Sequence, residues 1–257
     1  MKERVLQWLR GSHNSVRFRF LGLPKYWLTY LFQYRLRGRS WIEFYGDRLD
    51  GFVDIEKPLP EGYAARGEVF FAYIRKHDLE PHHRFLDYGC GFLRTALPVI
   101  RHLTEGRYVG VDISAQRIAR GRRYLRSNGI EDDAYEVHVV EDCKLRELEG
   151  QRFDFVWAMS VINHMPEEDI QIMLRALRPL MAPGGRFLFV FNEGETTRRW
   201  RMKDWWYPVS DVRRWCEEAG FGFEILPDYE EPEGYTRMAQ LTVPPAQSNA
   251  AKTALIR

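Results

Sequence analysis

Cysteine is scarce in this chain: its 257 residues include only Cys90, Cys143 and Cys216. They form no CxxC pair, and none lies in a Cys/His cluster with metal-ligand spacing. A disulfide framework and a structural zinc site are therefore excluded as the basis of the fold. We expect a reducing compartment and no bound metal.

Long apolar runs are also missing. No stretch of eighteen apolar residues occurs, so no transmembrane helix is predicted, and the first residues lack the continuous apolar core of a signal peptide. Both absences favour a cytoplasmic protein. A net charge of +2 and a pI near 8.4 are too small to indicate a nucleic-acid binder, so no specific nucleic-acid partner is expected.

Strand and helix patterns alternate from residue 84 onward. Short apolar runs predict strands, and the amphipathic stretches between them predict helices. The alternation favours an α/β fold: a Rossmann-like, doubly wound, mostly parallel seven-stranded sheet with helices on both faces and a C-terminal antiparallel hairpin. The predicted strands are 84–88, 107–111, 135–140, 153–158, 186–191, 221–226 and 235–242, and the predicted helices are 61–77, 92–103, 114–127, 166–182 and 210–219.

The first predicted strand ends in the segment Asp87-Tyr-Gly-Cys-Gly91. Gly89 and Gly91 lack the Cβ atoms that would keep a ligand away from the backbone. The helix predicted from residue 92 would point its N-terminal amides at the turn. Asp87 can accept hydrogen bonds from a ligand amine or hydroxyl. The pattern predicts a small-molecule site at a strand-to-helix crossing.

Two further acids end the next two predicted strands, Asp112 and Asp142. Asp112 lies 23 residues beyond Gly89 (112 minus 89), and an acid there suits the two hydroxyls of a ribose. Because the carboxyl ends of parallel strands meet at one edge of a sheet, we expect Asp87, Asp112 and Asp142 to line one crevice. A single acid at such a position is more often a helix cap, but three in succession beside a glycine turn weaken that interpretation.

Five segments in this order resemble the motifs of the class I S-adenosylmethionine-dependent methyltransferases, and the resemblance covers about residues 61–242. Leu93 stands where the family often has a third glycine, and Ala182 is an extra residue before Pro183-Gly184. Both departures bear on loop geometry rather than on a required contact. The segments are FLDYGCGFLR, YVGVDIS, VVEDC, FDFVWAMSVINHM and LRPLMAPGGRFLFVF.

The resemblance implies S-adenosylmethionine as cofactor and S-adenosylhomocysteine as product. The amino-acid end would rest on the glycine turn, the ribose on Asp112, and the adenine against Ile113 with Asp142 near its amine. Methyl transfer from a sulfonium is an in-line displacement, which needs alignment of the acceptor more than an enzyme nucleophile. The cofactor-binding residues implied in this way are Asp87, Gly89, Cys90, Gly91, Asp112, Ile113, Asp142, Cys143 and Met159.

His164 is the candidate general base, because it follows the fourth strand, where cofactor and acceptor should meet, and imidazole titrates near working pH. The alternative is a histidine that caps the loop and packs under the cofactor. No Pro-Pro-Tyr/Phe loop follows that strand, and no cysteine lies within residues 155–195, which disfavours two nucleic-acid methylation routes. An NAD enzyme is disfavoured because Arg94 replaces the third glycine of GxGxxG.

Residues 1–60 form an irregular basic and aromatic extension, with a short helix predicted at 24–36. Residues 1–50 contain ten lysines or arginines, four acids and eleven aromatics. Such a composition is compatible with a peripheral membrane contact or a homodimer contact, but we favour a lid over the acceptor pocket. The RRWRMKDWWYP insert after the fifth strand would supply another wall. The chain divides into the extension, 1–60, a methyltransferase domain, 61–243, and a flexible tail, 244–257.

The favoured function is methyl transfer to O or N of a small-molecule, sugar or lipid-linked acceptor. A protein or RNA methyltransferase, docking through the basic N-terminal segment, is one alternative. A non-catalytic partner subunit with the same fold is another. The intact acids and glycines of the motifs argue against the last of these.

Overall fold

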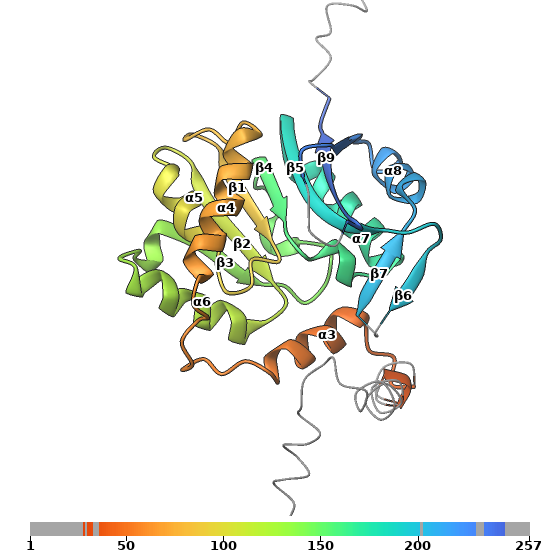
Figure 1. The fold of residues 1–257 in the computed structure, drawn as a ribbon, viewed down its shortest axis with the longest axis horizontal. Coiled ribbons are helices and arrows are strands. Elements are labelled where there is room, and N and C mark those ends of the chain that lie inside the picture. The colour runs from red at the N-terminus through yellow and green to blue at the C-terminus, as the bar shows by residue number, and fades with distance from the viewer. Residues whose placement is uncertain (1–27, 29, 33–35, 201–202, 230–233, 245–257) are drawn as a thin grey trace, which may run out of the picture.

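The computed structural model describes residues 28, 30–32, 36–200, 203–229 and 234–244 (Figure 1). In this part of the chain, parallel strands follow the order β3-β2-β1-β4-β5, and β5 also pairs with β7 and with β9. β9 is antiparallel to both β5 and β8. The strands are β1 (Arg84–Tyr88), β2 (Arg107–Asp112), β3 (Tyr135–Val139), β4 (Phe153–Ala158), β5 (Met181–Glu193), β6 (Arg198–Trp200), β7 (Asp204–Tyr207), β8 (Gly222–Leu226) and β9 (Thr236–Thr242).

Helices cover both faces of this sheet. One apolar cluster packs under α4 (Tyr63–Lys76), α5 (Ala96–His102) and α6 (Ala115–Ser127), and the other under α7 (Glu167–Leu177) and α8 (Val209–Glu218). The central strands are buried on both sides, which explains their continuous apolar runs. Phe85 stacks between Tyr108 and Phe155 of the neighbouring strands, with ring centroids 5.8 and 5.6 Å away. The doubly wound α/β fold with its C-terminal hairpin is confirmed.

Two predicted helix boundaries were wrong. Residues 92–95 form turns and α5 begins only at Ala96, because Leu93 has a φ of 57°, outside the helical region. The helix therefore does not begin directly after the glycine turn, as the sequence predicted, but five residues beyond Gly91. The helix predicted to reach residue 182 ends at Leu177 and continues as a 3₁₀ turn, Arg178–Leu180, before β5.

The structure adds β6 and β7 to the seven predicted strands. They pair with the part of β5 that continues past the carboxyl end of β4. The last pair between β4 and β5 joins Ala158 to Phe189, after which β5 runs on to Glu193. β7 pairs in parallel with this overhang, and β6 pairs antiparallel with β7. The side chain of Asn192 donates to the Trp205 carbonyl at 3.1 Å. The hairpin formed by β6 and β7 therefore lies next to the carboxyl end of β4.

Helix α3 (Trp41–Asp50) lies across the carboxyl ends of the strands (Figure 1). Ser40 caps it and forms a capping box with Glu43. The Trp41 indole donates to the His164 carbonyl at 2.8 Å, and Asp50 accepts from the Ser114 hydroxyl at the start of α6. An irregular conformation was therefore the wrong prediction for residues 41–50. The lid role predicted for the extension stays a prediction that this placement supports.

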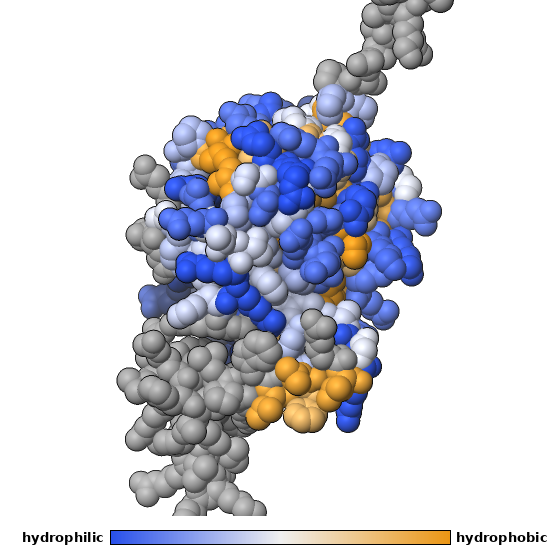
Figure 2. Space-filling view, turned by 90° about the vertical axis from the view of Figure 1, so that its right-hand side faces the viewer, coloured by the Kyte–Doolittle hydropathy of each residue, from blue (hydrophilic) through white to orange (hydrophobic). Residues whose placement is uncertain are grey.

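Most of the helix predicted at 24–36, and all of the tail beyond residue 244, lie outside the described residues. Among those that are described, exposed apolar side chains gather at the lower end of the molecule in Figure 2. They are Leu28, Leu31, Phe32 and Leu36, between 40% and 68% exposed. No helix within the described ranges is long and apolar enough to cross a bilayer.

Candidate active site

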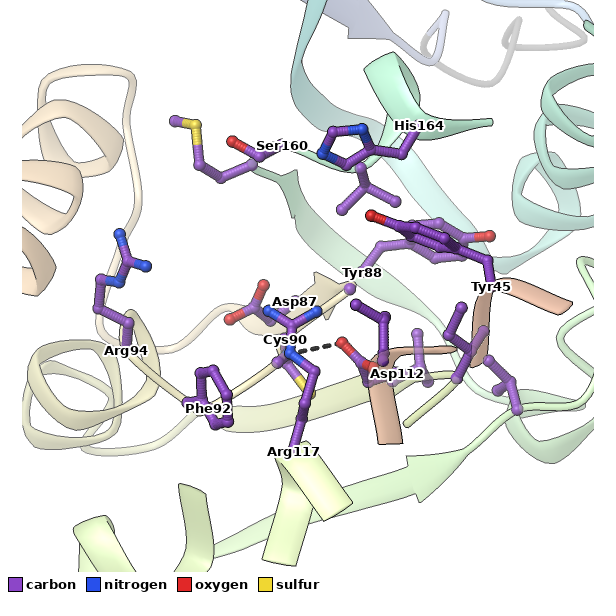
Figure 3. A pocket seen from close by; sticks show the side chains of 18 of the residues that line it. Tyr45, Asp87, Tyr88, Cys90, Phe92, Arg94, Asp112, Arg117, Ser160 and His164 are labelled. Carbon is purple, nitrogen blue, oxygen red and sulfur yellow. Dashed lines mark hydrogen bonds between the residues drawn. The ribbon is translucent and has the colours of Figure 1, made fainter. Parts of the chain in front are cut away.

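A cavity of about 420 Å³ lies at the carboxyl ends of β1, β2 and β4 (Figure 3). α3 contributes one wall, α4 another, and the loop after β4 a third. The volume and the largely apolar lining suit a small organic ligand. The residues predicted from the sequence that line the cavity are Asp87, Gly89, Cys90, Gly91, Asp112, Ile113, Met159 and His164.

The turn after β1 brings backbone to the cavity surface. Gly89 and Gly91 have φ angles of 78° and 52°, which residues with a Cβ rarely adopt. The amides of Gly89 and Cys90 donate to the Val111 carbonyl of β2 at 2.7 and 3.0 Å, which anchors the turn to the neighbouring strand. A Cβ on Gly89 would also collide with Val161 from the loop after β4. Both the torsion and the packing therefore require glycine at position 89.

Asp112 ends β2 with its carboxylate beside this turn. It accepts from the Gly91 amide at 2.8 Å and from the Ser114 amide at 2.9 Å. Burial raises the pKa of Asp112, while the Arg117 guanidinium and the two amides oppose the rise. Each carboxylate oxygen has more than one lone pair, so the group can still accept from two neighbouring ligand hydroxyls.

Asp87 ends the first strand within the same cavity. The Tyr108 hydroxyl donates to it at 2.7 Å. Burial raises the pKa of Asp87 to about 7, the Tyr108 hydrogen bond and Arg94 lower it, and Asp112 adds to the rise. Near neutral pH this side chain therefore exists in both the neutral and the charged form, and a cationic ligand would favour the charged one.

Two arginines that the sequence analysis did not place in the site also line the cavity. The guanidinium of Arg94 lies over the rings of Tyr63 and Phe70, at 4.8 and 5.5 Å from their centroids, and its Nε is buried without a hydrogen bond to any described residue. Arg117 lies over the Phe92 ring at 4.9 Å. Arg94 could have been found from its position three residues after the Gly-x-Gly turn. The sequence analysis took that position only as an argument against an NAD enzyme.

Asp142 and Cys143 do not line this cavity. The Asp142 carboxylate accepts from the Lys144 amide at 2.8 Å and is 43% exposed. Cys143 is buried and accepts a long contact, 3.8 Å, from the Tyr88 hydroxyl. Binding of the adenine by these two residues stays a prediction, and the contacts of Asp142 are those of an ordinary loop cap.

His164 lies at the rim of the cavity, at the end of a 3₁₀ turn (Ile162–His164) after β4. Its Nδ1 is 3.1 Å from a carboxylate oxygen of Asp204 and 3.2 Å from the Lys203 carbonyl. The Tyr45 ring of α3 lies 5.8 Å from the imidazole, centroid to centroid. Figure 3 shows His164 beside Ser160, with Tyr45 below it. Asp204, in β7, is a site residue that the sequence analysis missed.

Comparisons with known proteins agree with this geometry. Residues 86–187 match the family model described as a methyltransferase domain. The chain is 31% identical over 136 residues to methyltransferase GfsG of Streptomyces halstedii, covering 50% of this chain and 44% of that protein. It is 28% identical over 115 residues to a ubiquinone biosynthesis O-methyltransferase of Chelativorans sp., covering 45% and 42%. The chain thus spans less than half the length of these two relatives.

A solved structure gives the same fold. Magnesium protoporphyrin IX methyltransferase from Synechocystis PCC 6803, with bound SAM, superposes with a TM-score of 0.60 at 15% identity, covering 79% of this chain and 97% of that one. At this identity the likeness concerns the fold. Residues 86–187 thus match a methyltransferase domain, and the fold and the motifs from FLDYGCGFLR to LRPLMAPGGRFLFVF resemble those of the class I S-adenosylmethionine-dependent methyltransferases.

Proposed function

We propose that this protein transfers the methyl group of S-adenosylmethionine to an oxygen or nitrogen atom of a small-molecule, sugar or lipid-linked acceptor. One observation carries the proposal. A single cavity holds the glycine turn, both buried acids at the strand ends and, at its rim, a histidine. The cofactor supplies an electrophilic methyl group on a sulfonium. The chain supplies binding, alignment and exclusion of water.

The charges of the cavity fit an amino acid nucleoside. Asp87 and Arg94 are oppositely charged groups beside the glycine turn, which suits the ammonium and the carboxylate of an amino acid. Asp112 suits the two ribose hydroxyls. Ile113 and the side chains of α3 provide apolar surface for a base. The ammonium, the carboxylate, the ribose and the base of the cofactor would each meet a group of matching chemistry in this pose.

Trp41 of α3 lines the cavity, and additions to the common fold pack against it. Trp41 packs edge-on against Trp205 of β7, with ring centroids 6.5 Å apart. The Arg199 guanidinium of β6 lies over both rings, at 4.7 and 5.1 Å. An aromatic wall of this kind favours a small acceptor over a macromolecule. Two of the similar proteins, named for ubiquinone biosynthesis and for magnesium protoporphyrin IX, support a small-molecule acceptor.

Calorimetry tests the cofactor. S-adenosylmethionine or S-adenosylhomocysteine should bind with a micromolar Kd, corresponding to about 7–8 kcal/mol. NADH serves as the matched nucleotide control and should not bind. Binding of NADH in place of both adenosyl compounds would refute the proposal.

Labelled cofactor tests the acceptor class. The protein is incubated with S-adenosylmethionine carrying a radioactive methyl group and with a whole-cell extract, which is then divided into protein, RNA and low-mass fractions. We expect the label in the low-mass fraction. Label in protein or RNA would support the macromolecular alternative, and cofactor binding without label in any fraction would support a non-catalytic subunit.

A further inference from the structure

The environment of His164 determines which of its ring nitrogens carries the proton. Both groups within hydrogen-bonding distance of Nδ1, the Asp204 carboxylate and the Lys203 carbonyl, can only accept. In the neutral ring Nδ1 must therefore be the protonated nitrogen. Nε2 keeps its lone pair, and no described residue donates to it. The histidine is thus held as a base, and its unprotonated nitrogen lies at the rim of the cavity.

The surroundings of this ring are the Asp204 carboxylate, with Lys203 beside it, and the Tyr45 ring. Asp204 of β7 is half-buried, and although burial raises its pKa, the hydrogen bond from His164 and the charge of Lys203 lower it further, so that the pKa lies below its usual range. Lys203 Nζ lies 3.1 Å from the same carboxylate oxygen and partly offsets the negative charge. Tyr45 of α3 faces the ring from the other side, and burial raises its pKa to about 12, so it stays neutral.

The position of the ring is also fixed from two directions. Trp41 donates to the His164 carbonyl at 2.8 Å, and the Tyr207 hydroxyl of β7 donates to the next carbonyl, that of Met165, at 2.6 Å. The loop that carries His164 is therefore held between α3 and the β6–β7 hairpin. A histidine that merely filled space would not require a carboxylate at Nδ1 and a free Nε2.

We propose that Asp204 is a positioning residue that holds His164 as the proton acceptor of the reaction, and that the acceptor group is therefore a hydroxyl. The inference rests on the proposed function. A hydroxyl must lose its proton when it is methylated, whereas a neutral amine or a carboxylate already presents a free electron pair. A fixed base is therefore of most use to a hydroxyl acceptor.

Methyl transfer to the hydroxyl is a single displacement with loss of one proton. A lone pair of the hydroxyl oxygen forms the new bond to the methyl carbon, and the carbon–sulfur bond breaks with its electron pair left on sulfur, giving S-adenosylhomocysteine. The hydroxyl proton passes to Nε2 of His164, and the resulting imidazolium is stabilised by the Asp204 carboxylate. The proton then leaves to solvent, so the products are a methyl ether, the thioether and one proton.

Nuclear magnetic resonance of the full chain, labelled with ¹⁵N-histidine and saturated with S-adenosylhomocysteine, tests the assignment without needing the acceptor. His164→Gln identifies the resonance. We expect the tautomer protonated at Nδ1. In Asp204→Asn an amide, which can also donate, replaces the carboxylate 3.1 Å from Nδ1, so the tautomer protonated at Nε2 should become populated. The tautomer protonated at Nε2 in the parent protein, or an unchanged tautomer in Asp204→Asn, would overturn the role of Asp204.

Asp228→Asn is the matched control, because the Asp228 carboxylate contacts Nε2 of His77 at 3.2 Å, outside the cavity. It should leave the tautomer of His164 unchanged. The labelled low-mass product of the extract experiment tests the acceptor class: a methyl ether supports the proposal, and a methyl ester or methyl on nitrogen or sulfur overturns it. Absence of S-adenosylhomocysteine binding would instead contradict the proposed function, so the two failures are distinguishable.

Discussion

Cofactor binding should depend on pH through Asp87. Burial raises the pKa of this carboxyl group to about 7 in the free protein, so near pH 7 about half of the molecules hold it neutral. S-adenosylmethionine carries an ammonium and a sulfonium, and a nearby positive charge favours the ionised carboxylate. Below pH 7, binding should therefore be accompanied by release of a proton.

The size of this effect follows from linkage. With a pKa of about 7, the ionised fraction of Asp87 is about 0.03 at pH 5.5 and about 0.5 at pH 7, so affinity should be about fifteenfold weaker at pH 5.5. Stability changes in the opposite direction. The model value for an unfolded aspartate is 3.8, so the favourable contribution is complete below that pH and is lost as pH rises through 7. The free energy of unfolding of the free protein should fall by about 2 kcal/mol between pH 5 and 7 from this group.

Calorimetry at pH 5.5 and 7, in two buffers of different ionisation enthalpy, measures both the affinity and the number of protons released. Asp87→Asn is the control, because the amide has the shape of the neutral acid and can still accept from the Tyr108 hydroxyl. It should bind the cofactor more weakly at pH 7 and lose most of the pH dependence. Equal affinity of the parent protein at both pH values would refute the reasoning. A pH dependence that survives in Asp87→Asn would assign it to another group.

Three further outcomes are expected. Asp112→Asn should weaken S-adenosylhomocysteine binding by about 1–3 kcal/mol in calorimetry, whereas Asp133→Asn, exposed on the surface, should have no effect. Gly46→Leu should push α3 away from Ile113, because even a Cβ at position 46 would lie 3.2 Å from the Ile113 carbonyl. Cofactor affinity should then fall, while the circular dichroism spectrum stays unchanged. Asp47→Leu, on the exposed side of α3, is the control. A chain starting at Glu61 should lose methyl transfer. If the extension also contacts membranes, anionic vesicles should bind the full chain but not the shortened one, and added salt should release the full chain from the vesicles. If neither difference is seen, a homodimer contact remains, which light scattering would detect.

The strands were the most predictable part of the fold. Residues 84–88 and 153–158 match β1 and β4 at both ends, because a strand buried on both faces is a continuous apolar run bounded by polar residues. α3 was missed although Ser40 and Glu43 have the spacing of a capping box, which is readable in sequence. Gly46 and the mixed polar pattern of WIEFYGDRLD obscured the helix. That glycine is explained only by the close approach of α3 to Ile113, a tertiary contact.

The β6–β7 hairpin could not have been predicted from local pattern. Its strands are three and four residues long, too short for periodicity to define, and they form because β5 continues past β4 and leaves an edge to pair with. The contact between Asp204 and His164 depends on that hairpin. Arg94 was visible in the sequence, but its place over Tyr63 and Phe70 depends on the packing of α4 against the turn.

The site thus combines two kinds of information. The glycine turn, Asp87 and Asp112 belong to consecutive strand–turn–helix units, so their positions follow from a local pattern that many sequences share. The surroundings of His164 come from segments about 120 residues upstream and 40 residues downstream: Trp41 holds its carbonyl, and Asp204 holds its Nδ1. Under the proposed mechanism the acceptor lies beside His164, so these additions would form part of its surroundings. Exchange of α3 or of the hairpin between relatives should therefore change the acceptor and leave the cofactor the same.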